Sequence, residues 1–314
     1  MDQKVYGKKV STRYFQKNSV HFTDPFEYNI DKFMKTDPDL IHYTQIQQIR
    51  IDMKKLYGLT IDSEDRIYIT GDKSLLILDK DGKQILKNSL EIKAKCIDSG
   101  DDNLLYLGMT DHVEVYDNRG NRKDIWSSLG NNAIITSIAV TQKNVFVADA
   151  GNRMVMRFNK TGRLLNIIGE KNIGKKIPGL LIPSPFCDIA FGPDGYLWVV
   201  NPGRHALEKF NEEGDLISYW KTGASMNIED FCGCCNPVHM TIMNDGSFVT
   251  SEKGLPRVKI YNKRGDFISV VAGCENFLKR TTGLDLAVDS GNRIFVLDPK
   301  AVVLRVFLKN DTYR

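Results

Sequence analysis

The sequence predicts an all-β protein built as a six-bladed β-propeller. Three observations carry this prediction: short apolar strands recur along most of the chain, near-identical glycine turns join them, and the repeats are regularly spaced. Six units of roughly 36 to 51 residues, each with three or four short strands, are typical of propeller blades. A continuous β-sandwich is the alternative, and the regular spacing argues against it.

The glycine turns are the clearest repeated feature. Five of them follow an apolar strand end and read Asp or Asn, two further residues and then Gly. The glycines are Gly82, Gly120, Gly162, Gly214 and Gly265. Asp or Asn begins a type I turn, and Gly takes the left-handed position that follows. These turns therefore predict a hairpin at the end of the third strand of successive blades.

Short apolar runs predict the two inner strands of each blade. The innermost strands are expected at 59–62, 96–98, 138–140, 189–191, 240–242 and 286–288. The second strands are expected at 66–70, 104–108, 144–148, 196–200, 247–250 and 293–297. Most of these runs are rich in β-branched and aromatic residues, which fit a buried pleated surface.

The N-terminal region divides at about residue 40. Residues 1–40 are polar and aromatic without a period, which predicts an irregular extension, and residues 41–314 are expected to form one propeller domain. The 41–51 segment, IHYTQIQQIRI, has β-branched residues and partial alternation, which indicate a strand. Because the last repeat ends after its third strand, we expect this strand to close the last blade and cover its edge.

The third repeat resembles an NHL repeat. The resemblance is carried by Ile138–Val140, Val145–Arg153 and Arg157–Gly162, and it extends in weaker form from about residue 56 to residue 308. It implies a six-bladed propeller, a fold that hosts ligand binders, scaffolds and enzymes. Within this repeat, Asp149 and Arg153 resemble the pair that braces a loop in the family.

Composition excludes several classes of partner. The chain has 314 residues with 43 basic and 39 acidic side chains, a net charge of +4. That excess is too small to indicate nucleic-acid binding. No run of about 18 apolar residues is present, so no membrane span is expected. We expect a monomer whose partner is a small-molecule ligand or another protein.

Six positions, each just before an innermost strand, are expected to meet at one end of the central channel. They are Gly58, Lys95, Ser137, Asp188, His239 and Asp285. Innermost strands line the channel of a propeller, so these side chains can converge at its mouth. This ring is not an apolar plug, and its five side-chain-bearing members are candidate ligand-binding residues.

A cysteine-rich loop lies beside this ring. The segment 231–240, FCGCCNPVHM, contains three cysteines and His239, and two further cysteines fall in loops of the same face. Thiolate, imidazole and carboxylate groups are ligands of divalent transition metals. The candidate metal ligands are His239, Asp188, Asp285, Cys232, Cys234 and Cys235.

Disulfides are the alternative role of these cysteines, and inert or reactive thiols are a third. Two or more thiols could pair and pin the long loops 170–185 and 222–237. The candidates are Cys187, Cys232, Cys234, Cys235 and Cys274. Disulfides would indicate a periplasmic or secreted protein whose signal peptide has been removed; the cytoplasm is the alternative location.

The opening of the strand expected at 240–242 carries a second resemblance. Pro237–Ile242 is similar to the strand openings of the peptidyl-hydroxyglycine amidating lyase, an NHL-type propeller in which His residues from several blades hold zinc. This chain has one such His, with Asp188 and Asp285 at comparable places.

A calcium-dependent lactonase of the gluconolactonase type is a further six-bladed propeller. Its metal site needs a Glu at the channel position of the first blade. This chain has Gly58 at that position, which disfavours a lactonase.

These observations lead to two hypotheses of function. The first is a propeller that binds a ligand or protein partner at the Cys/His-rich mouth of its channel, outside the cytoplasm. The second is a metal-dependent lyase or hydrolase with His239, Asp188 and Asp285 at its centre, in which the imidazole is the general base. The residues alone leave this choice open.

Overall fold

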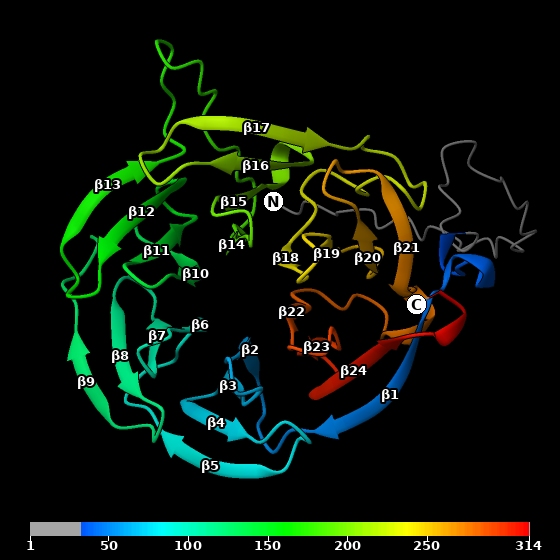
Figure 1. The fold of residues 1–314 in the computed structure, drawn as a ribbon, viewed down its shortest axis with the longest axis horizontal. Helices are drawn as coiled ribbons and strands as arrows, with labels where there is room; N and C mark the ends of the chain where they lie inside the picture. Colours follow the sequence, from blue (N-terminus) through cyan, green and yellow to red (C-terminus); the bar gives the residue numbers. More distant parts are fainter. Residues whose placement is uncertain (1–32, 314) are drawn as a thin grey trace, which may run out of the picture.

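The chain forms a ring of six four-stranded antiparallel sheets around a central channel (Figure 1). The computed structural model describes residues 33–313, and all the strands given below lie within that range. The predicted six-bladed propeller is confirmed. Within the described residues, the helical pieces are short 3-10 turns, η2 (Pro38–Leu40), η3 (Pro202–Arg204), η4 (Cys274–Asn276) and η5 (Asp311–Tyr313).

The strands of each blade follow one another from the channel outwards. Blade 1 contains β2 (Leu56–Ile61), β3 (Ile67–Gly71), β4 (Ser74–Leu78) and β5 (Gln84–Ser89). Blade 2 contains β6 (Cys96–Ser99), β7 (Leu104–Gly108), β8 (Val113–Asp117) and β9 (Arg122–Ile125). Blade 3 contains β10 (Ile135–Val140), β11 (Asn144–Asp149), β12 (Met154–Asn159) and β13 (Leu164–Ile168).

The second half of the ring repeats this order. Blade 4 contains β14 (Ile189–Phe191), β15 (Leu197–Asn201), β16 (Ala206–Phe210) and β17 (Leu216–Lys221). Blade 5 contains β18 (His239–Ile242), β19 (Phe248–Ser251), β20 (Val258–Tyr261) and β21 (Phe267–Ala272). Blade 6 contains β22 (Asp285–Val288), β23 (Ile294–Asp298), β24 (Val303–Lys309) and, on its outer side, β1 (Tyr43–Arg50).

The apolar core lies between the blades. The second strands β3, β11 and β15 are buried along their whole length, because a neighbouring blade covers each of their faces. Phe146 and Ile168 of blade 3 pack with Leu197 and Phe210 of blade 4 in one such cluster. The outermost strands, such as β5, have mostly exposed side chains, since nothing covers their outward face.

The five predicted glycine turns are present. Each glycine has a positive φ between 75° and 86°, the region that favours glycine. The Gly82 N–H donates to the Asp79 carbonyl over 2.9 Å, and the Gly265 N–H donates to the Asn262 carbonyl over 3.0 Å. The Asp79 carboxylate also accepts from two backbone N–H groups of its own turn.

The N-terminal strand closes the ring. β1 pairs antiparallel with β24, from Tyr43 opposite Lys309 to Arg50 opposite Val303, and the two lie side by side in Figure 1. The predicted closure of the last blade is therefore confirmed. Just before β1, Ile41 forms a parallel bridge with Val270 of blade 5. The boundary at residue 40 stays a prediction, because residues 1–32 lie outside the described range.

None of the helical turns in the described part of the chain is long and apolar enough to cross a membrane.

Candidate functional site

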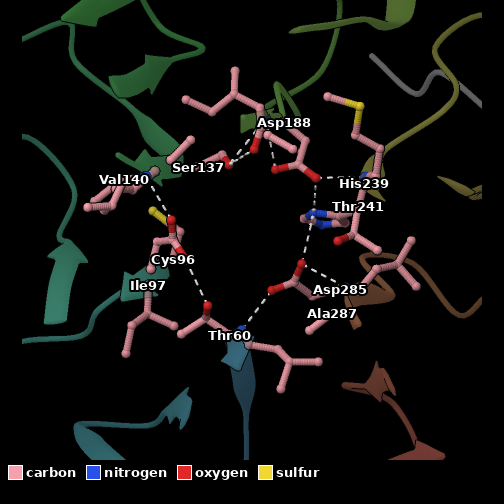
Figure 2. Close-up of a pocket in the computed structure, with 18 of the residues that line it drawn as sticks. Thr60, Cys96, Ile97, Ser137, Val140, Asp188, His239, Thr241, Asp285 and Ala287 are labelled. Carbon is pink, nitrogen blue, oxygen red and sulfur yellow. Dashed lines mark hydrogen bonds and ion pairs between the residues drawn. The ribbon is translucent and has the colours of Figure 1, made fainter. Parts of the chain in front are cut away.

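The five candidate ligand-binding residues of the ring all line the central cavity. This cavity has a volume of about 220 Å³, and the innermost strands of all six blades contribute to its wall. Its predicted members Lys95, Ser137, Asp188, His239 and Asp285 are all found there. Figure 2 shows Asp188, His239 and Asp285 on one side of the cavity, with Ser137 beside Asp188.

His239 lies between two carboxylates. Its Nδ1 atom is 3.5 Å from Oδ2 of Asp188 and 3.4 Å from Oδ1 of Asp285. Neither contact is aligned as a hydrogen bond, so this buried ring nitrogen has no hydrogen-bond partner. A buried polar atom without a partner costs free energy unless something else compensates it, and here two negative charges face it.

Both carboxylates also connect neighbouring blades. Asp188 Oδ2 accepts a hydrogen bond of 2.7 Å from the Met240 N–H, which joins blade 4 to blade 5. Asp285 Oδ2 accepts one of 2.7 Å from the Leu59 N–H, which joins blade 6 to blade 1. Each carboxylate therefore has two roles: it accepts a backbone N–H group of the next blade, and it places negative charge beside the channel.

The pKa values of His239 and Asp285 are both raised by their surroundings. Burial lowers the pKa of His239, but the charges of Asp285 and Asp188 outweigh burial, so the net shift is upwards. Burial raises the pKa of Asp285 to about 6; the nearby His239 opposes this rise and the charge of Asp188 adds to it. A group that exchanges a proton near neutral pH is suited to acid–base chemistry.

The three side chains also fit a divalent transition metal. His239 Nδ1 and one oxygen from each carboxylate lie within 4.8 Å of one another. Two ligands that each bind one ion at about 2.1 Å in a tetrahedral arrangement lie about 3.4 Å apart, which matches the two N–O distances. The partnerless Nδ1 is a free ligand atom. Among the described residues, this is the one such group of His, Cys, Asp and Glu, and the cysteines do not join it.

A second cavity forms the mouth of the channel and shares His239 with the first. It has a volume of about 460 Å³ and is largely apolar. Its apolar lining residues are Leu56, Ile134, Ile135, Pro185, Phe186 and Pro299. The Phe186 ring meets the His239 ring edge-on at 5.9 Å. The Lys95 ammonium lies 4.4 Å from the centre of the Tyr57 ring.

The charged side chains in the mouth cavity are all basic. They are Lys55, Lys95 and, when protonated, His239. Burial lowers the pKa of Lys95, and the charges of Lys93 and Lys55 lower it further. Asp188 and Asp285 line the central cavity and do not line the mouth. The mouth is therefore an apolar pocket with a positive rim.

The expected disulfides are not formed, because all six cysteines are free thiols. Cys187 is buried in the core between blades 3 and 4. Cys232 and Cys274 pack with Leu255 in a separate apolar cluster. Burial raises the pKa of Cys274 to about 11, which keeps its thiol protonated. Cys187, Cys232 and Cys274 are therefore buried thiols outside the group of candidate metal ligands.

Cys234 and Cys235 form a close pair at the surface beside the mouth. Their sulfurs are 3.4 Å apart, with Cys234 exposed and Cys235 buried. Burial alone would raise the pKa of Cys235, but hydrogen bonds from Lys253, Ser184 and Cys234 outweigh burial and lower it. The Lys253 Nζ donates to the Ser184 hydroxyl over 2.7 Å.

Sequence reasoning missed the walls of the mouth and the neighbours of the thiol pair. Tyr57 directly precedes the ring position Gly58, so extending the ring alignment by one residue would have found it. Phe186 lies two residues before Asp188, at the end of a long loop, and Lys253 comes from the loop after β19. No sequence pattern marks Phe186 or Lys253, because contacts between loops of different blades bring them to the site.

No protein-family model and no curated protein sequence match this chain. The fold, in contrast, is similar to that of several solved structures. A streptogramin B lyase structure has a TM-score of 0.60 at 11% identity and covers 85% of this chain and 98% of that one. Virginiamycin B lyase from Staphylococcus aureus has a TM-score of 0.55 at 15% identity, with 81% of each chain covered.

A third solved structure is a catalytically inactive His-to-Ala variant of the Staphylococcus aureus lyase with quinupristin. Its TM-score is 0.54 at 16% identity, and the alignment covers 84% of this chain and 88% of that one. Identities this low establish the architecture alone. The chain is a six-bladed β-propeller with the same architecture as the virginiamycin B lyases.

Proposed function

We propose that this propeller binds a small organic anion in the mouth cavity, with Lys95 and His239 as its polar anchors. The observation that carries the proposal is a cavity of about 460 Å³ with apolar walls and only basic charged side chains. Cavities of this size bury most of the surface of a small ligand, and a few placed polar groups orient it. The negative charge of a bound anion would also compensate the positive charges of Lys55 and Lys95 at the rim.

A matched pair of probes tests this proposal. We expect 2-naphthoate to bind more tightly than 2-naphthamide, which has the same shape without the charge, by at least about tenfold because one favourable charge contact contributes about 1.4 kcal/mol or more. Lys95→Met should reduce this preference, because His239 remains as the second anchor, and should leave the melting temperature unchanged. Isothermal titration calorimetry measures both affinities, and equal affinities for the two probes in the wild-type protein would contradict the proposal.

A metal-dependent lyase or hydrolase is the second candidate function. Its support is the buried Nδ1 of His239, which has no hydrogen-bond partner and faces Asp188 and Asp285. These three residues would hold a transition metal ion, which would polarise a carbonyl group of the substrate. Without a metal, the two carboxylates would orient the imidazole and stabilise it after it accepts a proton. Similar folds include lyases, one of which is inactivated by a His-to-Ala change.

Metal analysis and a turnover assay separate the two functions. Protein purified without chelator should contain one transition metal ion per chain if the second candidate is right. Quinupristin, the compound named with the inactive lyase variant, is the first substrate to test by mass spectrometry. His239→Ala should abolish both metal content and consumption of the compound. Metal-free protein that binds 2-naphthoate and leaves quinupristin intact supports the binding function alone.

The NHL type of the repeats and the cellular location of the protein are also proposals. An NHL-type repeat is supported by Asp149, whose carboxylate accepts from the N–H groups of Ile134, Gly151 and Asn152 and so braces the loop after β11. A periplasmic or secreted, monomeric protein stays our proposal, with the cytoplasm as the alternative, and the free cysteines remove the disulfide argument for export. Fractionation of cells that express the full-length natural gene product tests the location.

A further inference from the structure

We propose that Cys234 and Cys235 form a dithiol site that chelates a thiophilic centre with bent two-sulfur coordination, such as a trivalent arsenical. This site does not depend on the ligand proposed for the mouth cavity. The proposal rests on three features of the pair: the distance between its sulfurs, its access to solvent and the rigid loop that carries it.

The sulfur–sulfur distance favours chelation. Two thiolates bound at about 2.3 Å to one centre lie about 3.4 to 3.8 Å apart when the angle at that centre is about 95° to 110°. The sulfurs of Cys234 and Cys235 are already 3.4 Å apart. A linear two-sulfur complex would need a separation of about 4.6 Å, so the pair suits bent coordination.

A disulfide between the two residues is disfavoured. The Cα atoms of neighbouring residues lie about 3.8 Å apart across a trans peptide, whereas disulfides usually join Cα atoms about 4.4 to 6.8 Å apart. A disulfide here would be strained and easily reduced. The pair is therefore available as two thiols, which chelation requires.

The loop that carries the pair is fixed from several sides. The Asn236 side chain donates to the carbonyls of Cys232 and Lys253 and accepts from the Lys253 N–H over 2.9 Å. The Cys232 N–H donates to the buried Glu252 over 2.7 Å. Because the backbone is held on both sides of the pair, the sulfurs lose little freedom on binding, which favours affinity.

Access and charge also suit a soft ligand. Cys234 is exposed, so a reagent can reach the pair from solvent, and the nearby Lys253 and Ser184 lower the pKa of Cys235. The Lys253 ammonium would stabilise negative charge on a bound sulfur. No third His, Cys, Asp or Glu ligand joins the pair within residues 33–313. A bound centre would therefore have two protein sulfurs as ligands, and its own substituent would complete its coordination.

The binding step is balanced with phenylarsine oxide as the probe. Two As–S bonds form, the As–O bond breaks, and both thiol protons leave with the oxygen as one water. Arsenic remains trivalent, and neither sulfur is oxidised. The bound protein should therefore be heavier by one phenylarsine oxide minus one water.

Intact-mass spectrometry of the reduced full chain tests the proposal. We expect one adduct per chain that resists an excess of 2-mercaptoethanol and is removed by 2,3-dimercaptopropanol. Cys234→Ser and Cys235→Ser should each weaken the adduct at least about 100-fold, because the second sulfur no longer binds intramolecularly. Cys274→Ser, which changes a buried thiol outside the pair, is the matched control and should retain it.

Two results would overturn the proposal. One is an adduct that survives in Cys234→Ser and Cys235→Ser but is lost in Cys274→Ser, which would assign binding to the buried Cys232–Cys274 cluster. The other is a reduced protein with six titratable thiols that forms no stable adduct. Melting curves of each variant show that the protein is folded in every comparison.

Discussion

Replacing Glu252 by Gln should destabilise the protein strongly, because Glu252 is the buried anion that compensates two buried cations. Its carboxylate, which has no exposed surface, lies 2.6 Å from Arg257 Nε and 3.1 Å from Lys259 Nζ. It also accepts the Cys232 N–H. A glutamine side chain at this position would present an NH₂ group to these donors in place of a charge.

The expected loss follows from the burial of all three groups. Arg257 is 1% exposed and Lys259 is 0% exposed, so water cannot replace the lost carboxylate. Removing one partner of a buried ion pair costs about 3 to 5 kcal/mol. We expect Glu252→Gln to lower the free energy of unfolding by about 4 kcal/mol at pH 7, measured by urea denaturation followed by tryptophan fluorescence.

The same variant should show a characteristic pH dependence. Burial lowers the pKa of Lys259 to about 8 in the folded protein, although Glu252 opposes this shift. A lysine with a depressed folded pKa destabilises the fold while it is charged, and this penalty is relieved as the pH rises through the folded value. Without Glu252 that pKa falls further, so the variant should regain stability between about pH 7 and pH 10.

A control and a second variant complete this test. Asp266→Asn removes the partner of Arg264 in an exposed pair and should leave the free energy of unfolding nearly unchanged. Adding Lys259→Met to Glu252→Gln removes one uncompensated charge and should restore part of the loss. A loss below about 1 kcal/mol for Glu252→Gln would refute the argument from buried charge.

Three further outcomes are expected. Deleting residues 1–51 should expose the β24 edge and cause aggregation, measured by light scattering, whereas deleting residues 1–32, which leaves β1 in place, should not. The raised pKa of His239 stabilises the folded state in full below about pH 6.5, and this contribution is lost as the pH rises through the folded value. The stability difference between wild type and His239→Gln should therefore shrink as the pH rises above about 6.5. Denatured, unreduced protein should show six free thiols. A lower count would contradict the structure, in which no disulfide joins any of the six cysteines.

Repetition made the architecture predictable. Each blade repeats the same local signals, and a turn such as Asn262–Gly265 needs only four residues to specify its conformation. Ring closure by β1 was also predictable, because a repeat that lacks its outer strand must find one elsewhere in the chain. Strand positions agreed to within a few residues; β10 begins at Ile135, three residues before the predicted start.

The five ring residues could be placed for the same reason. Equivalent positions in equivalent strands point into one channel, so Asp188, His239 and Asp285 were expected near each other from alignment alone. Their distances could not be predicted. The contacts of 3.4 and 3.5 Å at His239 depend on how far each blade is tilted and how closely the innermost strands approach.

The sequence by itself determined the repeat, the closing strand and the ring of channel residues, since local turn chemistry and strand period specify each of them. Only the tertiary structure decided which side chains complete the site. Phe186, Lys253 and Glu252 reach the mouth and the 231–237 loop through contacts between separate loops, and no local pattern encodes such contacts. The tertiary structure also separated the cysteines into buried thiols and one surface pair, because burial depends on the packing of whole blades.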